Sequence, residues 1–144
     1  SLSNSERIFE KGVMTIGRTI PKQTVTKKIN RIVSQTTESM KELGVYKKEF
    51  DTTIRRYANI RLQYDLLNEE WYENGCHVTE KYTNKNGSTN NRKTALYLSI
   101  ESLRKELLDI ENTLGLTPKG LKQIQANGLK EKKKSALDKV LLNV

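Results

Sequence analysis

The longest uninterrupted helical pattern in the chain is KKEFDTTIRRYANIRLQYDLLNEEWYENG, residues Lys47–Gly75. Apolar side chains recur in it at steps of three and four residues, the spacing that lines them along one face of an α-helix. The stripe consists of Phe50, Ile54, Tyr57, Ala58, Tyr64, Leu67 and Trp71. Asn74-Gly75 ends the pattern, since glycine readily adopts the left-handed conformation that closes a helix. The stretch therefore predicts a helix over Lys47–Glu73, roughly 40 Å long.

Two further helical patterns lie on either side of this one. The earlier pattern covers Thr24–Leu43, with Thr24 as the candidate N-cap and Gly44 as the stop. The later pattern covers Arg92–Leu114. Both repeat apolar residues at helical steps. The earlier stripe consists of Val25, Ile29, Ile32, Val33, Met40 and Leu43, and the later one of Leu96, Ile100, Leu103, Leu107, Ile110 and Leu114.

The segment Cys76–Asn91 between the two long helices has a different character. CHVTEKYT alternates over a short span and contains β-branched residues, and NKNGSTNN is a polar turn cluster with Asn86-Gly87 at its centre. We interpret it as a short hairpin or an ordered loop that joins two antiparallel helices. In that arrangement the acidic end of the second helix is expected to meet Arg92 and Lys93, where the third helix begins.

The stretch LGLTPKGLKQI, residues Leu114–Ile124, combines a helix stop with a helix start. Gly115 suits the left-handed position after a helix, Thr117 can cap the next one, and Pro118 fits a first helical turn. The stretch predicts a short helix from Pro118 to about Ala126. The tail that follows has helical spacing at Leu137, Val140 and Leu141, and we expect it to be helical only when it is docked on a partner.

Together these patterns predict an all-α fold. Its centre is a long antiparallel helical hairpin, with a flanking N-terminal helix, a short β-prone connector and a short C-terminal helix. Residues 1–23 are predicted to be a flexible segment, of which residues 1–13 read as vector-derived because a plausible start follows at Met14. Residues 24–127 form the helical core and oligomerisation domain, and residues 128–144 form a basic tail.

The composition is lean for a protein that folds alone. Only 35% of the residues are hydrophobic and 30% are charged. Such a chain suits elongated helices that complete the burial of their apolar stripes against other subunits. The side chains predicted to form the oligomer interface are Phe50, Ile54, Tyr57, Tyr64, Trp71, Leu103, Leu107 and Ile110. Base stacking by the aromatic residues of this stripe is the less favoured alternative.

Positive charge gathers at the two ends of the chain. The net charge is +9, of which residues 1–31 carry +5 and residues 115–144 carry +5, so the middle carries −1. Basic ends around a neutral body favour an anionic partner, most simply nucleic acid. The candidate DNA contacts are Lys27, Lys28, Arg31, Arg55, Arg56, Lys130, Lys132, Lys133 and Lys134.

Other functional classes find little support. Cys76 and His77 are the only cysteine and histidine, too few for a zinc site within one chain and without the partners of a catalytic thiol. The carboxylates of Glu69, Glu70 and Glu73 suit a solvated helix end, and no glycine-rich phosphate loop is present. We therefore expect no enzymatic activity, no metal and no cofactor. No apolar run is long enough to span a membrane, and a single cysteine favours an intracellular setting.

The chain resembles the small terminase subunits of tailed bacteriophages over about Lys28–Gln125. The resemblance rests on ELGVYKKEFDTTIRRYANIRLQYDLLNEEWYENG, a β-prone polar connector and a long helix ending in ENTLGLTPKGLKQI, with Leu114–Pro118 as its sharpest signature. The sequence departs from the family pattern at Leu121, where many relatives carry Arg, and in STNNRK, where many carry Pro. The first departure removes a basic role from that position.

The resemblance implies a non-enzymatic part of the DNA-packaging motor. Such proteins assemble into rings, bind viral double-stranded DNA, and recruit or regulate the large subunit that holds the ATPase and nuclease, in the cytoplasm of the host cell. The apolar C-terminal tail is the hypothetical docking element for the large subunit. Two alternatives remain: a dimeric helix-turn-helix transcriptional regulator that reads a palindromic operator, and a structural scaffold whose charges only aid solubility.

Overall fold

The computed structural model describes the backbone of residues 19–142, and the side chains of residues 19–128, 140 and 141. In chain order the elements are α2 (Lys22–Glu42), the short 3-10 helix η1 (Lys48–Phe50), α3 (Asp51–Glu73), β1 (Thr79–Thr83), β2 (Thr89–Lys93), α4 (Ala95–Leu114) and α5 (Pro118–Leu142). The fold is thus mainly helical, as predicted, and two strands that form one small antiparallel sheet add to the all-α description.

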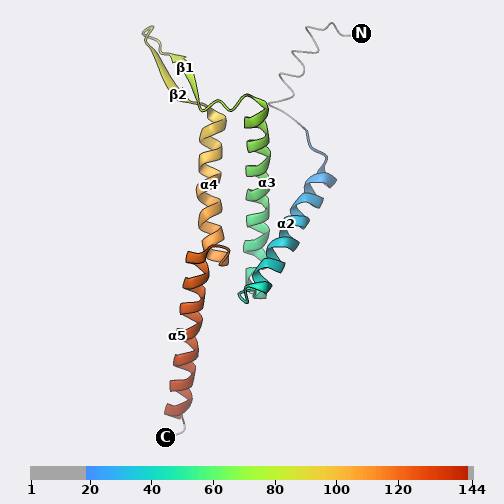
Figure 1. Cartoon of the computed structure of the whole chain (residues 1–144), viewed down its shortest axis with the longest axis vertical. Helices are drawn as coiled ribbons and strands as arrows, with labels where there is room; N and C mark the ends of the chain where they lie inside the picture. Colours follow the sequence, from blue (N-terminus) through green and yellow to red (C-terminus); the bar gives the residue numbers. More distant parts are fainter. Residues whose placement is uncertain (1–18, 143–144) are drawn as a thin grey trace.

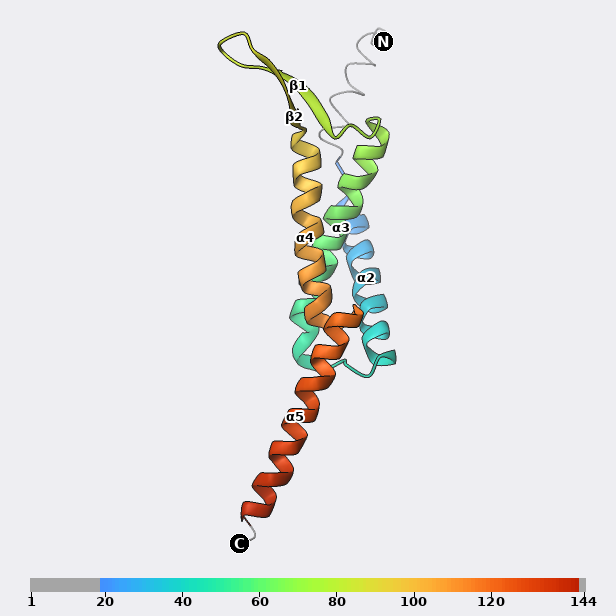
Figure 2. The same ribbon diagram turned by 60° about the vertical axis from the view of Figure 1, so that its left-hand side comes forward.

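Three helices lie side by side and form the body of the molecule. α3 and α4 run antiparallel, and α2 leans against α3 on the side away from α4 (Figure 1). The β1–β2 hairpin projects from one end of this body, and α5 leaves the other end in the direction in which α4 was running (Figures 1 and 2). α3 and α4 are thus in contact along the body, and the elements at its two ends extend further than the sequence indicated.

The principal buried cluster lies where the α2–α3 turn meets the α4–α5 junction. It consists of Met40, Val45, Ile54, Tyr57, Leu107 and Leu114, each at most 5% exposed. Leu116, Leu121 and Ile124 from the junction and from α5 pack against it. Apolar stripes at helical spacing have thus met as the sequence pattern predicts. This cluster fixes where α5 begins.

The ends of α2 and α3 differ in detail from the prediction. α2 begins after Pro21, so Thr24 lies inside the helix, and no side chain caps its start. The reason is that proline suits the entry to a helix and Lys22 and Gln23 continue it. Gly44 ends α2 with a φ of +72°, as predicted. α3 proper begins at Asp51 after η1, not at Lys47.

The connector between α3 and α4 is a β-hairpin, which confirms one of the two alternatives. Thr79 pairs with Lys93 and Thr83 pairs with Thr89, with a turn that includes Gly87 at a φ of +79°. Arg92 and Lys93 therefore belong to β2, and α4 begins only at Ala95. The sequence pattern predicts that both meet the acidic end of α3, whereas the ion pair of Lys93 is with Glu101 on α4. Arg92 instead pairs with Glu80 across the hairpin, at 2.8 Å.

The α4–α5 junction follows the helix stop and restart read from LGLTP. Gly115 has a φ of +75°, and the Leu116 amide donates to the Glu111 carbonyl at 2.9 Å. The Gly120 amide donates to Thr117 Oγ1 at 3.1 Å, so Thr117 caps α5 as predicted. The prediction of a short helix was wrong, because α5 runs on to Leu142. Good helix formers on both sides of Gly128 offset its cost of about 1 kcal/mol.

Candidate nucleic-acid interface

The N-terminal half of α2 is strongly basic. Residues 22–31 contain four cationic side chains and no carboxylate. Lys27, Lys28 and Arg31 are all exposed. A helix places residues one turn apart on the same face, so Lys27 and Arg31 lie together and Lys28 is turned about 100° from Lys27.

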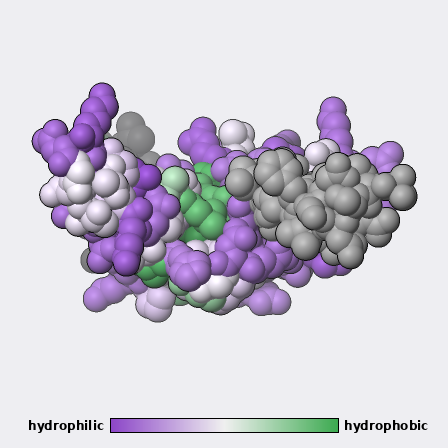
Figure 3. All heavy atoms as spheres, turned by 90° about the horizontal axis from the view of Figure 1, so that it is seen from above, coloured by the Kyte–Doolittle hydropathy of each residue, from purple (hydrophilic) through white to green (hydrophobic). Residues whose placement is uncertain are grey.

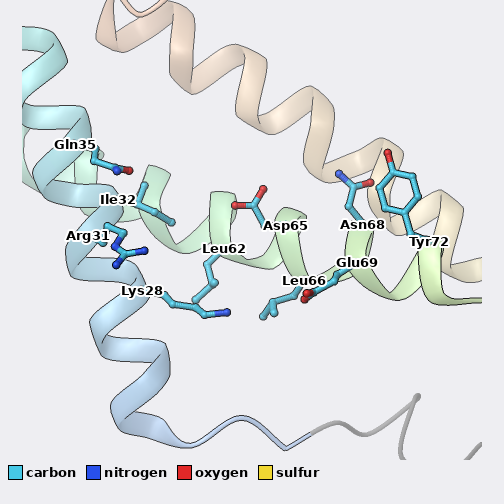
Figure 4. A pocket seen from close by; sticks show the side chains of 10 residues that line it. All are labelled: Lys28, Arg31, Ile32, Gln35, Leu62, Asp65, Leu66, Asn68, Glu69 and Tyr72. Atoms are coloured by element: carbon cyan, nitrogen blue, oxygen red, sulfur yellow. The ribbon is translucent and has the colours of Figure 1, made fainter.

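Lys28 and Arg31 line a groove between α2 and α3, whereas Lys27 does not. The groove has a volume of about 610 Å³, and its α3 wall includes Asp65 and Glu69 (Figure 4). Two cations thus face two carboxylates across the groove, which lowers the net charge that it presents. Lys27 lies outside this groove. Its ammonium group therefore faces solvent and does not share the groove with Asp65 and Glu69.

Arg55 and Arg56 do not join this basic surface. Both are exposed near the start of α3. Lys28 and Arg31 face the part of α3 from Leu62 to Tyr72. At the rise of an α-helix, that segment lies roughly 10–25 Å along α3 from Arg55 and Arg56. The structure therefore divides the predicted DNA contacts between opposite ends of the helical body. The side chains of Lys130 and Lys132–Lys134 lie outside the described residues.

The β1–β2 hairpin is a basic element that the sequence analysis missed. Residues 74–94 carry four cations and one carboxylate, whereas residues 22–73 and 95–114 together carry twelve of each. All ten strand residues are exposed. This positive charge is visible in the sequence. It was overlooked because residues 32–114 were counted together: the +3 of the hairpin and the −4 of the other residues sum to −1.

Hydrogen bonds at its base fix the direction of the hairpin. Trp71 Nε1 donates to the His77 carbonyl at 3.0 Å, and the Thr94 amide donates to the Val78 carbonyl at 3.0 Å. Thr94 also caps α4, since its hydroxyl accepts from the Tyr97 amide at 3.1 Å. The hairpin is therefore tied to the last turn of α3 and the first turn of α4.

An ion pair adds to this attachment. Lys93 Nζ donates to both carboxylate oxygens of Glu101 on α4, at 2.8 and 3.0 Å. This hydrogen bond raises the pKa of Lys93 and lowers the pKa of Glu101. Arg92 is also occupied, because it pairs with Glu80 and lies 4.2 Å from the centre of the Tyr82 ring.

The side chains predicted to form the oligomer interface fall into two groups. Ile54, Tyr57 and Leu107 are buried inside the single chain. The others, Phe50, Tyr64, Trp71, Leu103 and Ile110, are partly buried. Their role in subunit contact stays a prediction. Figure 3, a view along the long axis, shows an apolar area near the middle of the surface and hydrophilic side chains over much of the rest.

On α3 and α4, three large apolar or aromatic side chains outside the predicted interface set are more than half exposed. Leu98 and Leu108 on α4 are 52% and 54% exposed, and Tyr72 on α3 is 67% exposed. Helical periodicity did not single out Leu98 and Leu108, because they lie off the main apolar stripe. They add to the apolar surface that the single chain leaves open.

A polar network joins α3 to α4 inside the helical body. The Tyr57 hydroxyl donates to Glu111 Oε1 at 3.3 Å and accepts from Arg61 Nη1 at 3.4 Å. Burial raises the pKa of Tyr57. The tyrosine is therefore neutral and serves the helix contact. Among the described residues, no group of three His, Cys, Asp or Glu side chains could hold a metal ion.

Comparison with known proteins decides the family. The sequence matches the phage terminase small subunit family over residues 10–131, which is most of the chain. The chain belongs to the phage terminase small subunit family. Its role therefore lies in the packaging of phage DNA. No curated protein and no solved structure matches this small terminase subunit. Within the residues described, no helix is long and apolar enough to cross a membrane.

Proposed function

We propose that this small terminase subunit binds viral double-stranded DNA as a ring-like homo-oligomer and recruits or regulates the large ATPase and nuclease subunit. It has no catalytic role of its own in this proposal and works in the host cytoplasm. Family membership supports the packaging role, and the observation that carries the DNA contact is the N-terminal half of α2. Its four cations stand without a carboxylate over ten residues.

Phosphate contacts are the kind of DNA binding that this surface supports. Lys27 faces solvent, and Lys28 and Arg31 border an open groove rather than a deep cavity. Lysine binds a phosphate as a point charge and needs no base-specific geometry. A few such contacts per subunit are weak, but they add up when several linked subunits engage one duplex.

An oligomer is supported by apolar surface that one chain leaves exposed. The principal core cluster holds six buried side chains, while Leu98, Leu108 and Tyr72 remain more than half exposed. Association of copies through the long helices would cover these side chains together with the partly buried members of the predicted interface. At the end of α5, Val140 and Leu141 are 64% and 70% exposed and are the proposed contact for the large subunit.

The proposal is tested by replacing the α2 cations. We expect K27Q/K28Q/R31Q to weaken binding to duplex DNA. The slope of log K against log salt should fall in magnitude by about 0.9 for each phosphate that the variant no longer neutralises. K41Q/K47Q/K48Q is the matched control, because it removes the same charge from the opposite end of α2 and from the turn that follows. Equal weakening in both variants would mean that net charge alone, not this surface, binds DNA.

Native mass spectrometry tests the assembly. A closed oligomer of many copies supports the ring, whereas a stable dimer would favour the helix-turn-helix regulator and a monomer would contradict the proposal. The family match favours the packaging protein over the regulator. Wild-type protein that fails to bind DNA at low and at moderate salt would leave only the scaffold interpretation.

A further inference from the structure

We propose that the β1–β2 hairpin is a DNA-contacting arm, with Lys81 and Lys85 on the phosphates of double-stranded DNA. The inference rests on the proposed function, because it assumes that this small terminase subunit binds DNA. It assigns that binding a second site, on an element that lies between the two long helices in sequence and beyond them in space (Figures 1 and 2).

The two faces of the hairpin are both polar. The pairing register places Lys81 opposite Asn91 on one face and Tyr82 opposite Asn90 on the other. The outer part of the first face adds Thr83 and Thr89, whose hydroxyl oxygens lie 3.2 Å apart. A two-stranded hairpin without an apolar face gains little stability from burial. A projecting ribbon of this kind therefore contributes little to the packing of the chain's own core.

The charge of the hairpin is available for a partner at its outer part. Arg92 and Lys93 near the base are engaged by Glu80 and Glu101. Lys81 and Lys85 lie further out and have no ion-pair partner among the described residues. The hairpin thus presents two exposed ammonium groups beyond a base whose charges are balanced.

The chemistry of the surface favours a duplex over a protein partner. Protein interfaces bury apolar and aromatic side chains at their centre. The hairpin's strands offer only Tyr82, which is 43% exposed and has Arg92 against its ring. Hydroxyl, amide and ammonium groups are instead those that contact DNA phosphates and base edges. The major groove is wide enough to admit a two-stranded ribbon.

The position of the hairpin also suits a shared DNA surface. β1 begins six positions after the last residue of α3, and Tyr72 from that end of α3 lines the groove that holds Lys28 and Arg31. The basic half of α2 and the hairpin therefore lie toward the same end of the molecule. The hydrogen bonds of Trp71 and Thr94 hold the ribbon in one direction, so little ordering is needed on binding.

The experiment compares K81Q/K85Q with K47Q/K48Q in the full-length protein. Both doubles remove two exposed lysines, the second pair at the opposite end of the helical body. Binding to a duplex is measured by fluorescence anisotropy across a range of salt concentrations. For K81Q/K85Q we expect the affinity for DNA to fall roughly tenfold to hundredfold near 0.1 M salt. The slope of log K against log salt should decrease in magnitude by about 2 for each hairpin that contacts the duplex. K47Q/K48Q should change affinity less than twofold.

The outcomes separate this inference from the proposed function. If the wild-type protein binds DNA and K81Q/K85Q binds equally well, the hairpin inference is overturned and the proposed function stands. If the wild-type protein does not bind, both fail. Native mass spectrometry of K81Q/K85Q should show the wild-type oligomer. A change in subunit number with unchanged DNA affinity would overturn the inference and assign the hairpin to subunit contact.

Discussion

The α4–α5 junction depends on the absence of a side chain at Gly120. A Cβ built there would lie 2.1 Å from the carbonyl oxygen of Asn112 and 2.7 Å from its carbonyl carbon and Cα. These are backbone atoms of α4, so they cannot swing aside as the end of a flexible side chain could. Gly120→Ala must therefore separate the start of α5 from the end of α4 by about 1 Å to restore an ordinary contact.

The cost of that separation follows from what the junction holds. Overpacking in a rigid site costs about 1–3 kcal/mol, and strain on the hydrogen bond from the Gly120 amide to Thr117 adds up to about 1 kcal/mol. Alanine returns about 1 kcal/mol through its better helix propensity. We expect Gly120→Ala to lower the free energy of unfolding by about 2 kcal/mol and the Tm by roughly 7 °C.

Gly128→Ala is the matched control on the same helix. No atom lies within 4 Å of a Cβ at that position, so only the gain in helix propensity remains, worth up to about 1 kcal/mol. Circular dichroism during thermal and urea unfolding measures both variants, at one protein concentration because oligomers melt in a concentration-dependent way. The two substitutions should act in opposite directions. Gly120→Ala as stable as the wild type would refute the close approach of α5 to α4.

Three further predictions concern the core and the base of the hairpin. Met40 is fully buried, so Met40→Ala should cost about 2–5 kcal/mol in urea unfolding, and a cost below about 1 kcal/mol would contradict its place in the core. Thr94→Ala removes the cap of the Tyr97 amide and should cost about 1 kcal/mol, seen as faster amide exchange in the first turn of α4 but not in α2. Lys93 lowers the pKa of Glu101, and a carboxyl with a depressed folded pKa stabilises the fold fully above its unfolded value, about 4.3. Acidification through the folded pKa of Glu101 should therefore release the Lys93–Glu101 contact, which an NMR titration of the wild-type protein can follow. Glu101→Gln should abolish this titration step. The same step in the variant would mean that another group titrates.

Helical periodicity predicted the body of the fold because burial of one apolar stripe per helix decides it. The long helix through Ile54 and Tyr57 and the helix through Leu107 and Leu114 were both found where the stripes predicted them. Periodicity was less informative for α5, since a glycine at position 128 resembles a stop even when the residues on both sides favour a helix. It also assigned Arg92 and Lys93 to a helix, because the cross-strand pairing that holds them in β2 is a contact between distant residues.

The candidate DNA surface could be predicted only in part from the sequence. A basic α2 is visible as a local run of cations, and Lys27, Lys28 and Arg31 are exposed as expected. Their separation from Arg55 is not visible in the sequence, because it depends on how α2 folds back along α3. The acidic wall of the groove has the same origin, since Asp65 and Glu69 come from a different helix.

The β1–β2 hairpin and the C-terminal end of α5 are too far apart to contact the same small surface of a partner. α4 spans about 30 Å and α5 about 37 Å at the rise of an α-helix, and Figure 1 shows them end to end, with the hairpin at the start of α4. The hairpin and the far end of α5 are therefore roughly 60 Å apart, the length of about 18 base pairs at about 3.4 Å each. Since the basic half of α2 lies toward the hairpin, a duplex held there leaves Val140 and Leu141 free to contact another protein. Under the proposed function, one subunit can thus hold DNA at one end and the large subunit at the other without competition between them.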